Sequence, residues 1–142
     1  MRIEHQELQE DLTAAAAAGG KTADAAKAVM KVLLPHILLE EEFAIPPLKY
    51  LPALARGEFD PEMKRILTKT ETLKAALPRM LDEHKLIVEA LRKLLQAAMS
   101  EQHARYVRFA QKLILHAQTE EEILYPASIM VGEYIKLRLG LA

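Results

Sequence analysis

One motif occurs twice in this chain and restricts how the chain can fold. His36 opens the run HILLEEEFAIP, and the run HAQTEEEILYP repeats the pattern 80 residues later from His116. Both runs read H-x-x-x-E-E-E-x-x-x-P. In an α-helix, residues i and i+4 lie on the same face, so each histidine shares a face with the first glutamate of its triplet, Glu40 or Glu120. The repeat therefore predicts two helices that each present a histidine beside a carboxylate.

The residues around both motifs place this face in the protein core. Valine, leucine, phenylalanine and isoleucine flank each histidine and first glutamate at helical spacing. The two stripes consist of Val29, Leu33, His36, Glu40 and Phe43, and of Phe109, Leu113, His116, Glu120 and Ile123. The remaining glutamates of each triplet are rotated away from the stripe, and we expect them to face water. They are Glu41, Glu42, Glu121 and Glu122.

Four of the five histidines are expected to lie at one level of the fold. They are His5, His36, His84 and His116. The first two flank Gly19-Gly20 at nearly equal distances, and the last two flank Ser100 by 16 residues on each side. In two antiparallel helix hairpins, these equal arms bring all four to the same height, near the end opposite both turns. His103 lies far from that level, and we expect it to be exposed and not a ligand.

Turn and helix-breaking residues divide the chain into four long helices within a single domain, 1–142. Gly19-Gly20 ends the first helix, and Asp60-Pro61 is a typical start for an extra short helix. We expect Pro78 to stop or kink that short helix, Ser100 to be the N-cap of the last long helix, and Pro126 to end it. The expected bundle helices span 3–18, 22–43, 79–98 and 101–125, with a connecting segment at 44–77, whose own helix covers 60–77, and a tail at 127–142.

Composition excludes several classes of function. The chain has 142 residues, a formal net charge of −1 and no cysteine. The balanced charge does not indicate a basic surface for nucleic acid or an anionic membrane. The lack of cysteine excludes disulfides and thiolate sites. No apolar run approaches the ~20 residues that span a bilayer, and the charged N-terminus is unlike a signal peptide. We therefore expect a soluble, cytoplasmic protein with no nucleic-acid or membrane partner.

Histidines and glutamates on core stripes predict a metal centre. Burying an ionised carboxylate costs several kcal/mol unless it is paired or binds a metal, and two facing carboxylates repel each other. Two divalent cations bridged by Glu40 and Glu120 would remove both penalties. Nitrogen and oxygen donors without thiolate suit iron, manganese or zinc. The expected metal ligands are His5, His36, Glu40, His84, His116 and Glu120. A purely structural bundle, in which these residues only hydrogen-bond one another, remains the alternative.

At these residues the chain resembles the hemerythrin-like, or HHE cation-binding, family. The resemblance covers the chain from His5 to Pro126 and rests on the order His, H-x-x-x-E, His, H-x-x-x-E. It implies an all-α, up-down-up-down four-helix bundle, here with an extra short helix between the second and third helices and a short C-terminal helix. It also implies a non-haem di-iron site bridged by carboxylates and an oxo or hydroxo group. Members bind oxygen reversibly, sense oxygen or iron, handle nitric oxide or peroxide, or serve in iron repair.

The chain departs from the oxygen-carrying members of that family in two places. Those members have a second histidine one turn after the third-helix ligand, where this chain has Val88. Their last acid follows its histidine by five residues, a place held here by Glu121, whereas the i+4 spacing favours Glu120. The candidates to complete the ligand set are Glu83, Glu89, Glu121 and Tyr125. The leading hypothesis is a protein that binds, stores or senses oxygen or iron, and the alternative is a di-iron enzyme acting on hydrogen peroxide or nitric oxide.

The connecting segment at 44–77 and the tail are both expected at the metal end. We expect the segment to cap the site and to control the access of small molecules. Its expected apolar walls are Phe43, Ile45, Leu48, Tyr50 and Leu51. The apolar tail residues either pack on the cap or form a homodimer contact, and the sequence leaves both open. They are Ile129, Met130, Tyr134, Ile135 and Leu137.

Overall fold

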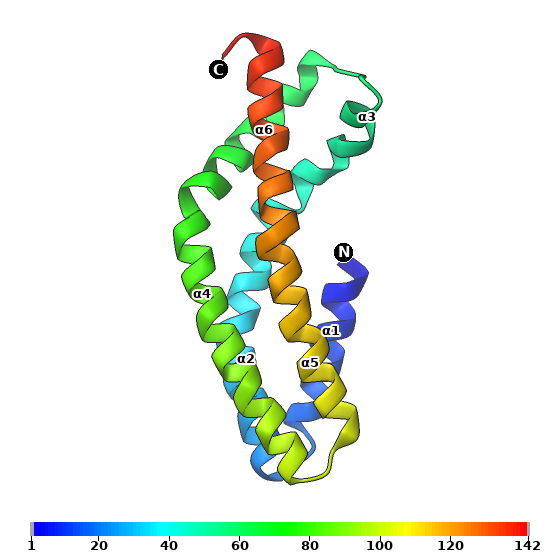
Figure 1. Cartoon of the computed structure of the whole chain (residues 1–142), viewed down its shortest axis with the longest axis vertical. Helices are drawn as coiled ribbons and strands as arrows, with labels where there is room; N and C mark the ends of the chain where they lie inside the picture. The colour runs from blue at the N-terminus through cyan, green and yellow to red at the C-terminus, as the bar shows by residue number, and fades with distance from the viewer. Residues whose placement is uncertain (1, 142) are drawn as a thin grey trace.

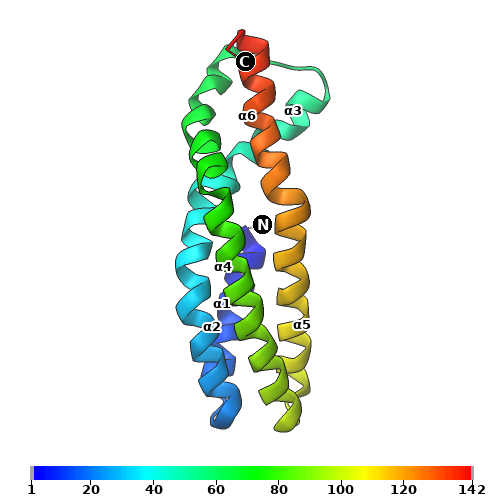
Figure 2. The same ribbon diagram turned by 60° about the vertical axis from the view of Figure 1, so that its left-hand side comes forward.

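The structure, a computed structural model, describes residues 2–141, with side chains from His5 onward. Every regular element in this range is helical, and four long helices pack side by side (Figures 1 and 2). These are α1 (Arg2–Ala16), α2 (Gly20–Leu39), α4 (Leu67–Ser100) and α5 (Ala104–Thr119). A further helix, α6 (Tyr125–Leu139), continues the line of α5. The all-α prediction is confirmed. No helix within the described range is both long and apolar enough to cross a membrane.

The turns that join α1 to α2 and α4 to α5 lie at the same end of the molecule (Figure 1). Gly19 and Gly20 have φ values of 81° and 64°, which glycine adopts without the steric cost that other residues meet. The prediction that Ser100 caps the last helix was wrong. Ser100 is the last residue of α4, and His103 precedes α5. The chain reverses at Gln102, whose φ is 58°.

Glu101 links these two turns. Its carboxylate accepts hydrogen bonds from the Thr22 hydroxyl at 2.6 Å, the Thr22 N–H at 2.7 Å and the Lys21 N–H at 3.2 Å. The two N–H groups belong to the first turn of α2, where a helix has no internal acceptors, and a negative charge there is favourable. A Cβ at Gly20 would collide with this carboxylate. The acid of one hairpin therefore caps a helix of the other.

We expect Glu101→Gln to lower the melting temperature at pH 7. Hydrogen bonds from the Thr22 side chain and backbone hold the pKa of Glu101 below its ordinary value of 4.5. A depressed pKa contributes stability above the ordinary value, and that stability is lost as the pH falls through the folded-state pKa. Thermal melts at pH 7 and below pH ~3 test this, with Glu7→Gln, an exposed acid on α1, as the control. If the difference in melting temperature between Glu101→Gln and the parent were the same at both pH values, the Glu101 carboxylate would not stabilise the fold through its charge.

The helix stripes predicted from spacing form the main core up to the two motifs, but the last residue of each stripe does not: Ile123 is 63% exposed and Phe43 only partly buried, because the π turns place Leu124 and Ala44 inward instead. Val29, Leu33, Phe109 and Leu113 are all buried there, as expected. The same cluster takes Leu8, Leu12 and Ala15 from α1 and Ile87, Leu91, Leu94 and Ala98 from α4. This apolar core fills the space between the two turns and the level of the four histidines.

Pro78 bends a helix and does not stop it, the second of the two outcomes that the sequence left open, so the expected start of a bundle helix at residue 79 was wrong. The proline lies inside α4, a single 34-residue helix that bows outward in Figure 1. Pro78 has no N–H to donate to the carbonyl of Lys74, four residues earlier in the helix. Both residues are exposed. Water can solvate that carbonyl, while buried Leu73 and Met80 on either side hold the helix against its neighbours. A helix with a proline on its wet face bends instead of ending.

Both copies of the motif end their α-helix in a π turn, η1 (Glu40–Ala44) and η4 (Glu120–Leu124). The Ile45 N–H bonds the carbonyl of Glu40, and the Tyr125 N–H bonds that of Glu120. Each bond spans five residues, and the next residue in both copies is the proline, which has no N–H to continue the ladder. The prediction that Pro126 ends the last helix was wrong, because it lies in the first turn of α6, where proline is tolerated.

The segment that follows the first motif folds over the histidine level. It contains η2 (Pro46–Tyr50), α3 (Leu51–Ala55) and η3 (Pro61–Ile66), which leads directly into α4. Asp60 caps η3 as predicted, accepting the Glu62 N–H at 2.9 Å. The cover over the histidines is an apolar cluster built on Ala44, Leu73, Met80, Leu124 and Tyr125, with Phe43, Leu48 and Ile129 packed against it.

Of the other expected wall residues, Ile45 is partly buried, Tyr50 packs in a second cluster farther along, and Leu51 is largely exposed. The prediction that the histidines lie near the end of the molecule was wrong. The first half of α4 and all of α6 continue beyond it, and in Figure 1 the N-terminus stands about half-way up the long axis.

The tail packs on the cap, one of the two alternatives that the sequence left open. Val131 and Ile135 of α6 are buried against Met63 and Ile66 of η3. Met130 and Leu137 remain exposed at 63% and 65%. The tail therefore forms part of the fold of a single chain, and a homodimer contact through it remains a prediction.

Gly132 lets α6 pack tightly against α4 at Thr70. A Cβ at this position would collide with the side chain of buried Thr70. We expect Gly132→Ala to destabilise the fold by about 1–3 kcal/mol, because an extra group in a packed contact forces both helices to shift. Urea denaturation measures the loss. The double variant Thr70→Ala/Gly132→Ala should recover part of it, and equal losses in the single and double variants would contradict this packing account.

Candidate metal centre

All six predicted ligand residues converge at one level of the bundle. His5 comes from α1, His36 from α2, His84 from α4 and His116 from α5, and the two π turns add Glu40 and Glu120 as their first residues. Five of the six residues are buried, and His116 has 19% of its side chain exposed. The π turns therefore begin at the residues that carry the carboxylates, a common location for such turns.

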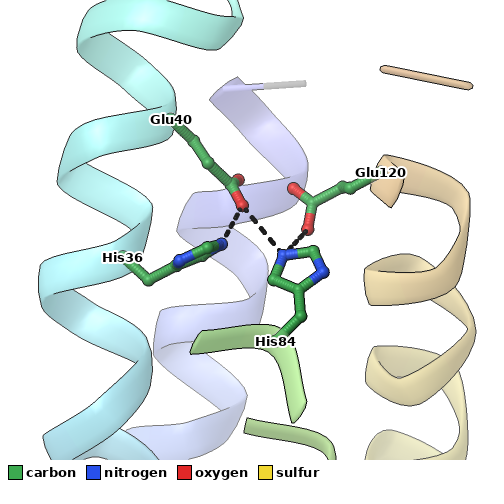
Figure 3. Close-up of side chains that lie close together, drawn as sticks. All are labelled: His36, Glu40, His84 and Glu120. Carbon is green, nitrogen blue, oxygen red and sulfur yellow. Dashed lines mark ion pairs between the residues drawn. The ribbon is translucent and has the colours of Figure 1, made fainter. Parts of the chain in front are cut away.

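Four of these residues form the first of two groups that can hold a metal ion, called here the inner position. It consists of His36, Glu40, His84 and Glu120 (Figure 3). The Nε2 atom of His36 lies 2.7 Å from Glu40 Oε1. The Nε2 atom of His84 lies 3.6 Å from the same oxygen and 3.5 Å from Glu120 Oε1. Two imidazole nitrogens and two carboxylate oxygens thus face a common point.

The second group, called here the outer position, consists of His5, His116 and Glu120. The Nε2 atoms of His5 and His116 lie 3.7 Å and 3.3 Å from Glu120 Oε2. His5 Nε2 also lies 3.3 Å from Glu40 Oε2. Each carboxylate therefore turns one oxygen toward the inner position and the other toward the outer position.

Carboxylates of neighbouring helices hold the two inner histidines from behind. The Nδ1 atom of His36 lies 2.9 Å from Glu83 Oε2, and the Nδ1 atom of His84 lies 3.0 Å from Glu121 Oε1. Glu83 is in turn paired with Arg79 at 3.2 Å. A carboxylate that holds Nδ1–H keeps the ring oriented so that, once a metal ion replaces the proton on Nε2, the Nε2 lone pair faces the centre, an arrangement found for most metal-binding histidines.

The expectation that the later glutamates of each triplet face water was half wrong. Glu121 reaches His84, and Glu41 Oε1 lies 3.6 Å from His5 Nδ1, so both lie at helix interfaces. Glu42 and Glu122 are exposed, as predicted. The residue after an inward-facing one is rotated by about 100° and points toward the adjacent helix. Which helix stands there cannot be read from the spacing within one motif.

Tyr125 places its hydroxyl within hydrogen-bond distance of three of the four residues of the inner position. The hydroxyl donates to Glu40 Oε1 at 2.6 Å and lies 2.9 Å from the Nε2 atoms of His36 and His84. The residue is fully buried. Burial and the charge of Glu40 raise the pKa of Tyr125 far above its ordinary value, so the phenol stays protonated in the metal-free protein. The π turn positions this side chain five residues after Glu120.

The two carboxyl groups have opposite pKa shifts. Burial raises the pKa of Glu40, but hydrogen bonds from three histidines outweigh burial and hold that pKa well below its ordinary value. Burial, helped by the neighbouring Glu40 carboxylate, raises the pKa of Glu120 by more than His116 and His5 lower it. Burial also lowers the pKa of His5, yet Glu120 and Glu40 raise it overall from 6.5 to about 10. In the metal-free protein, protons thus supply the positive charge that the two carboxylates require.

Three other positions considered in the sequence lie outside the centre. Glu89 is exposed on α4, and Val88 is partly buried without a polar group. His103 is partly buried, not exposed as expected, and it packs near Tyr106 in the turn before α5. It belongs to neither group of candidate ligands in the described chain.

Comparison of the chain with protein-family models, with curated proteins and with solved structures finds no match.

Proposed function

We propose that this chain is a hemerythrin-like protein that holds two metal ions, iron in its working form, between the four helices. The observation that carries the proposal is the orientation of Glu40 and Glu120. Each carboxylate directs one oxygen to the inner position and one to the outer position, at 2.7–3.7 Å from the histidine nitrogens. Such carboxylates are suited to bridge two cations. His5, His36, His84 and His116 would supply the terminal ligands.

Buried atoms without hydrogen bonds at the centre support metal binding. His116 Nε2, Glu120 Oε2 and His5 Nδ1 are buried and make no hydrogen bond, although the first two lie 3.3 Å apart as an ion pair. A buried polar group without a hydrogen bond costs about 1–3 kcal/mol, and the first two of these atoms face the outer position. A cation bound there would satisfy both. In a bundle with a purely structural role, six converging buried polar groups would be expected to hydrogen-bond one another fully.

The donor set suits hard and borderline metal ions better than soft ones. It contains imidazole nitrogens and carboxylate oxygens, together with the phenol oxygen of Tyr125. No cysteine is present, so soft metal ions have no preferred ligand. Iron, manganese and zinc all accept this set. Iron is our proposal because the resemblance to the hemerythrin-like family implies it, with an oxo or hydroxo bridge between the ions.

The resemblance also accounts for the helix order. With both tight turns at one end, α1, α2, α4 and α5 fit an up-down-up-down bundle (Figure 2). Each of these helices carries one of the four histidines. The apolar cluster around Met80 and Leu124 would act as the lid that restricts access to the ions.

The bound species is expected to be a small molecule such as oxygen, nitric oxide or peroxide. The cavity among the six ligand residues measures about 10 Å³, which is room for roughly one water molecule. Its apolar side is formed by Leu8, Leu33, Ile37, Ile87 and Leu113. A bound iron pair supplies the electrons that such molecules accept. The residues position the ions, exclude bulk water, and hold one proton on the Tyr125 oxygen.

Tyr125 supports a second candidate function, the decomposition of hydrogen peroxide. Oxygen-carrying members of the family have a histidine where this chain has Val88, and the structure instead offers a buried hydroxyl beside Glu40. A protonated group at that place can donate a proton to a departing oxygen. The overall reaction converts two hydrogen peroxide molecules into two water molecules and one oxygen molecule.

Exposure of the iron-loaded protein to oxygen and to peroxide separates the two functions. A visible spectrum that appears under oxygen and disappears under vacuum, without turnover, supports oxygen binding. Steady oxygen evolution from hydrogen peroxide, lost in Glu40→Ala, supports the enzyme. Iron-loaded protein that responds to neither molecule would contradict the proposed function.

A further inference from the structure

The inner and outer positions differ in how firmly their histidines are held. His36 and His84 each have an outer carboxylate at hydrogen-bond distance from Nδ1, provided by Glu83 and Glu121. Among the described residues, neither His5 nor His116 has such a hydrogen bond, and the carboxylate nearest to His5 Nδ1 is 3.6 Å away. Loss of one outer-shell partner typically lowers metal affinity by about 10- to 100-fold.

The two positions also differ in exposure. Every ligand of the inner position is buried, and Tyr125 and its apolar neighbours close the position from above. The outer position contains His116, the one ligand of the six with substantial exposure, 19%. His116 faces α1, which packs far more extensively on α2 than on α5. Of the six ligand residues, His116 is therefore the most accessible to solvent, although its Nε2 atom is buried.

Because of charge, the second ion binds less tightly than the first. The first divalent ion meets two carboxylates, which balance its charge. A second ion must share the same two carboxylates while it is repelled by the first. The inner position, whose histidines are held by outer carboxylates, therefore fills first. The outer position then binds its ion with lower affinity.

We infer that the two metal positions fill in a fixed order, inner before outer, and that the outer ion is the exchangeable one. This inference rests on the proposed binuclear centre and adds that Glu83 and Glu121 act as positioning residues for the inner ion. Metal supply then sets whether the protein carries one ion or two. The inner ion stays bound when the outer ion leaves.

Titration of metal-free protein with Co²⁺, followed by its visible absorption, tests the order. We expect two steps, the first at least 10-fold tighter than the second, and faster removal of the second equivalent by a chelator. His116→Ala should keep the first equivalent with its absorption unchanged and lose the second. His103→Ala, which alters the histidine outside the centre, should bind both.

The positioning residues have matched controls within the same chain. Glu83→Gln and Glu121→Gln should each weaken the first step by about 10- to 100-fold and change its absorption spectrum. Glu42→Gln and Glu122→Gln, at exposed positions, should change neither. Circular dichroism verifies that each variant retains its helices.

Two equivalents that bind and leave in one step would overturn the inference while leaving the binuclear centre intact. So would loss of both equivalents in folded His116→Ala, or unchanged first steps in Glu83→Gln and Glu121→Gln. Absence of any stoichiometric Co²⁺ binding would overturn the proposed function and this inference together.

Discussion

Glu40→Gln is expected to lower the affinity for both metal ions by at least about 100-fold. The Glu40 carboxylate lies 2.7 Å from His36 and 3.3 Å from His5, so it serves both positions. Glutamine keeps the size of the side chain but removes the negative charge and one acceptor oxygen. The loss should exceed the 10- to 100-fold effect of an outer-shell partner, because Glu40 would contact the ions directly. Equilibrium dialysis against Fe²⁺ under anaerobic conditions measures it.

Glu42→Gln is the matched control for this substitution. Glu42 belongs to the same triplet and the same π turn, but it is exposed. The control should bind two ions with unchanged affinity. If Glu40→Gln also bound two ions as tightly as the parent, Glu40 would not be a bridging ligand.

Metal loading is expected to raise the melting temperature by more than about 10 °C. An ion that binds the folded chain alone, at a free concentration about 1,000 times its dissociation constant, adds roughly 4 kcal/mol to the free energy of unfolding. For a chain of this size, each kcal/mol corresponds to about 3–4 °C. Calorimetry of metal-free and loaded protein at one pH measures the shift.

The same calorimetric experiment on Glu40→Gln separates specific from general effects. Ions that act only by screening surface charge would stabilise the parent and the variant equally. A shift confined to the parent supports ligation at the centre. A parent that gains no stability with saturating metal would contradict binding by the folded state.

The sequence predicted that the six residues converge because its signal is local. The i+4 spacing from His36 to Glu40 places both side chains on one face without reference to any other helix. The equal arms around Gly19-Gly20 then predicted that His5 would meet them, and the structure brings these residues together. The burial of the apolar stripes up to the two motifs followed from the same periodicity.

The parts that sequence reasoning missed depend on contacts between distant segments. Pro78 reads as a helix stop or kink, and the helix continues because the proline faces solvent and residues on both sides pack on other helices. Pro126 reads as an end, yet the π turn before it shifts the hydrogen-bond ladder by one residue. Local helix propensity does not predict that the helices continue at these two prolines, because tertiary packing determines the outcome.

The outer carboxylates show the same limit. Glu83 and Glu121 each adjoin a predicted ligand in sequence, but each contacts a histidine from a different helix. Their role follows from the arrangement of helices, which fixes the neighbour that each side chain meets. Tyr125 was one of several candidates until the π turn directed its hydroxyl toward Glu40.

Metal analysis of the purified chain after anaerobic loading with Fe²⁺ and removal of unbound ions tests the central claim most directly. The six convergent ligand residues and their two shared carboxylates predict two iron ions per chain. Less than one ion per chain after loading, in protein whose circular dichroism shows intact helices, would contradict a binuclear centre.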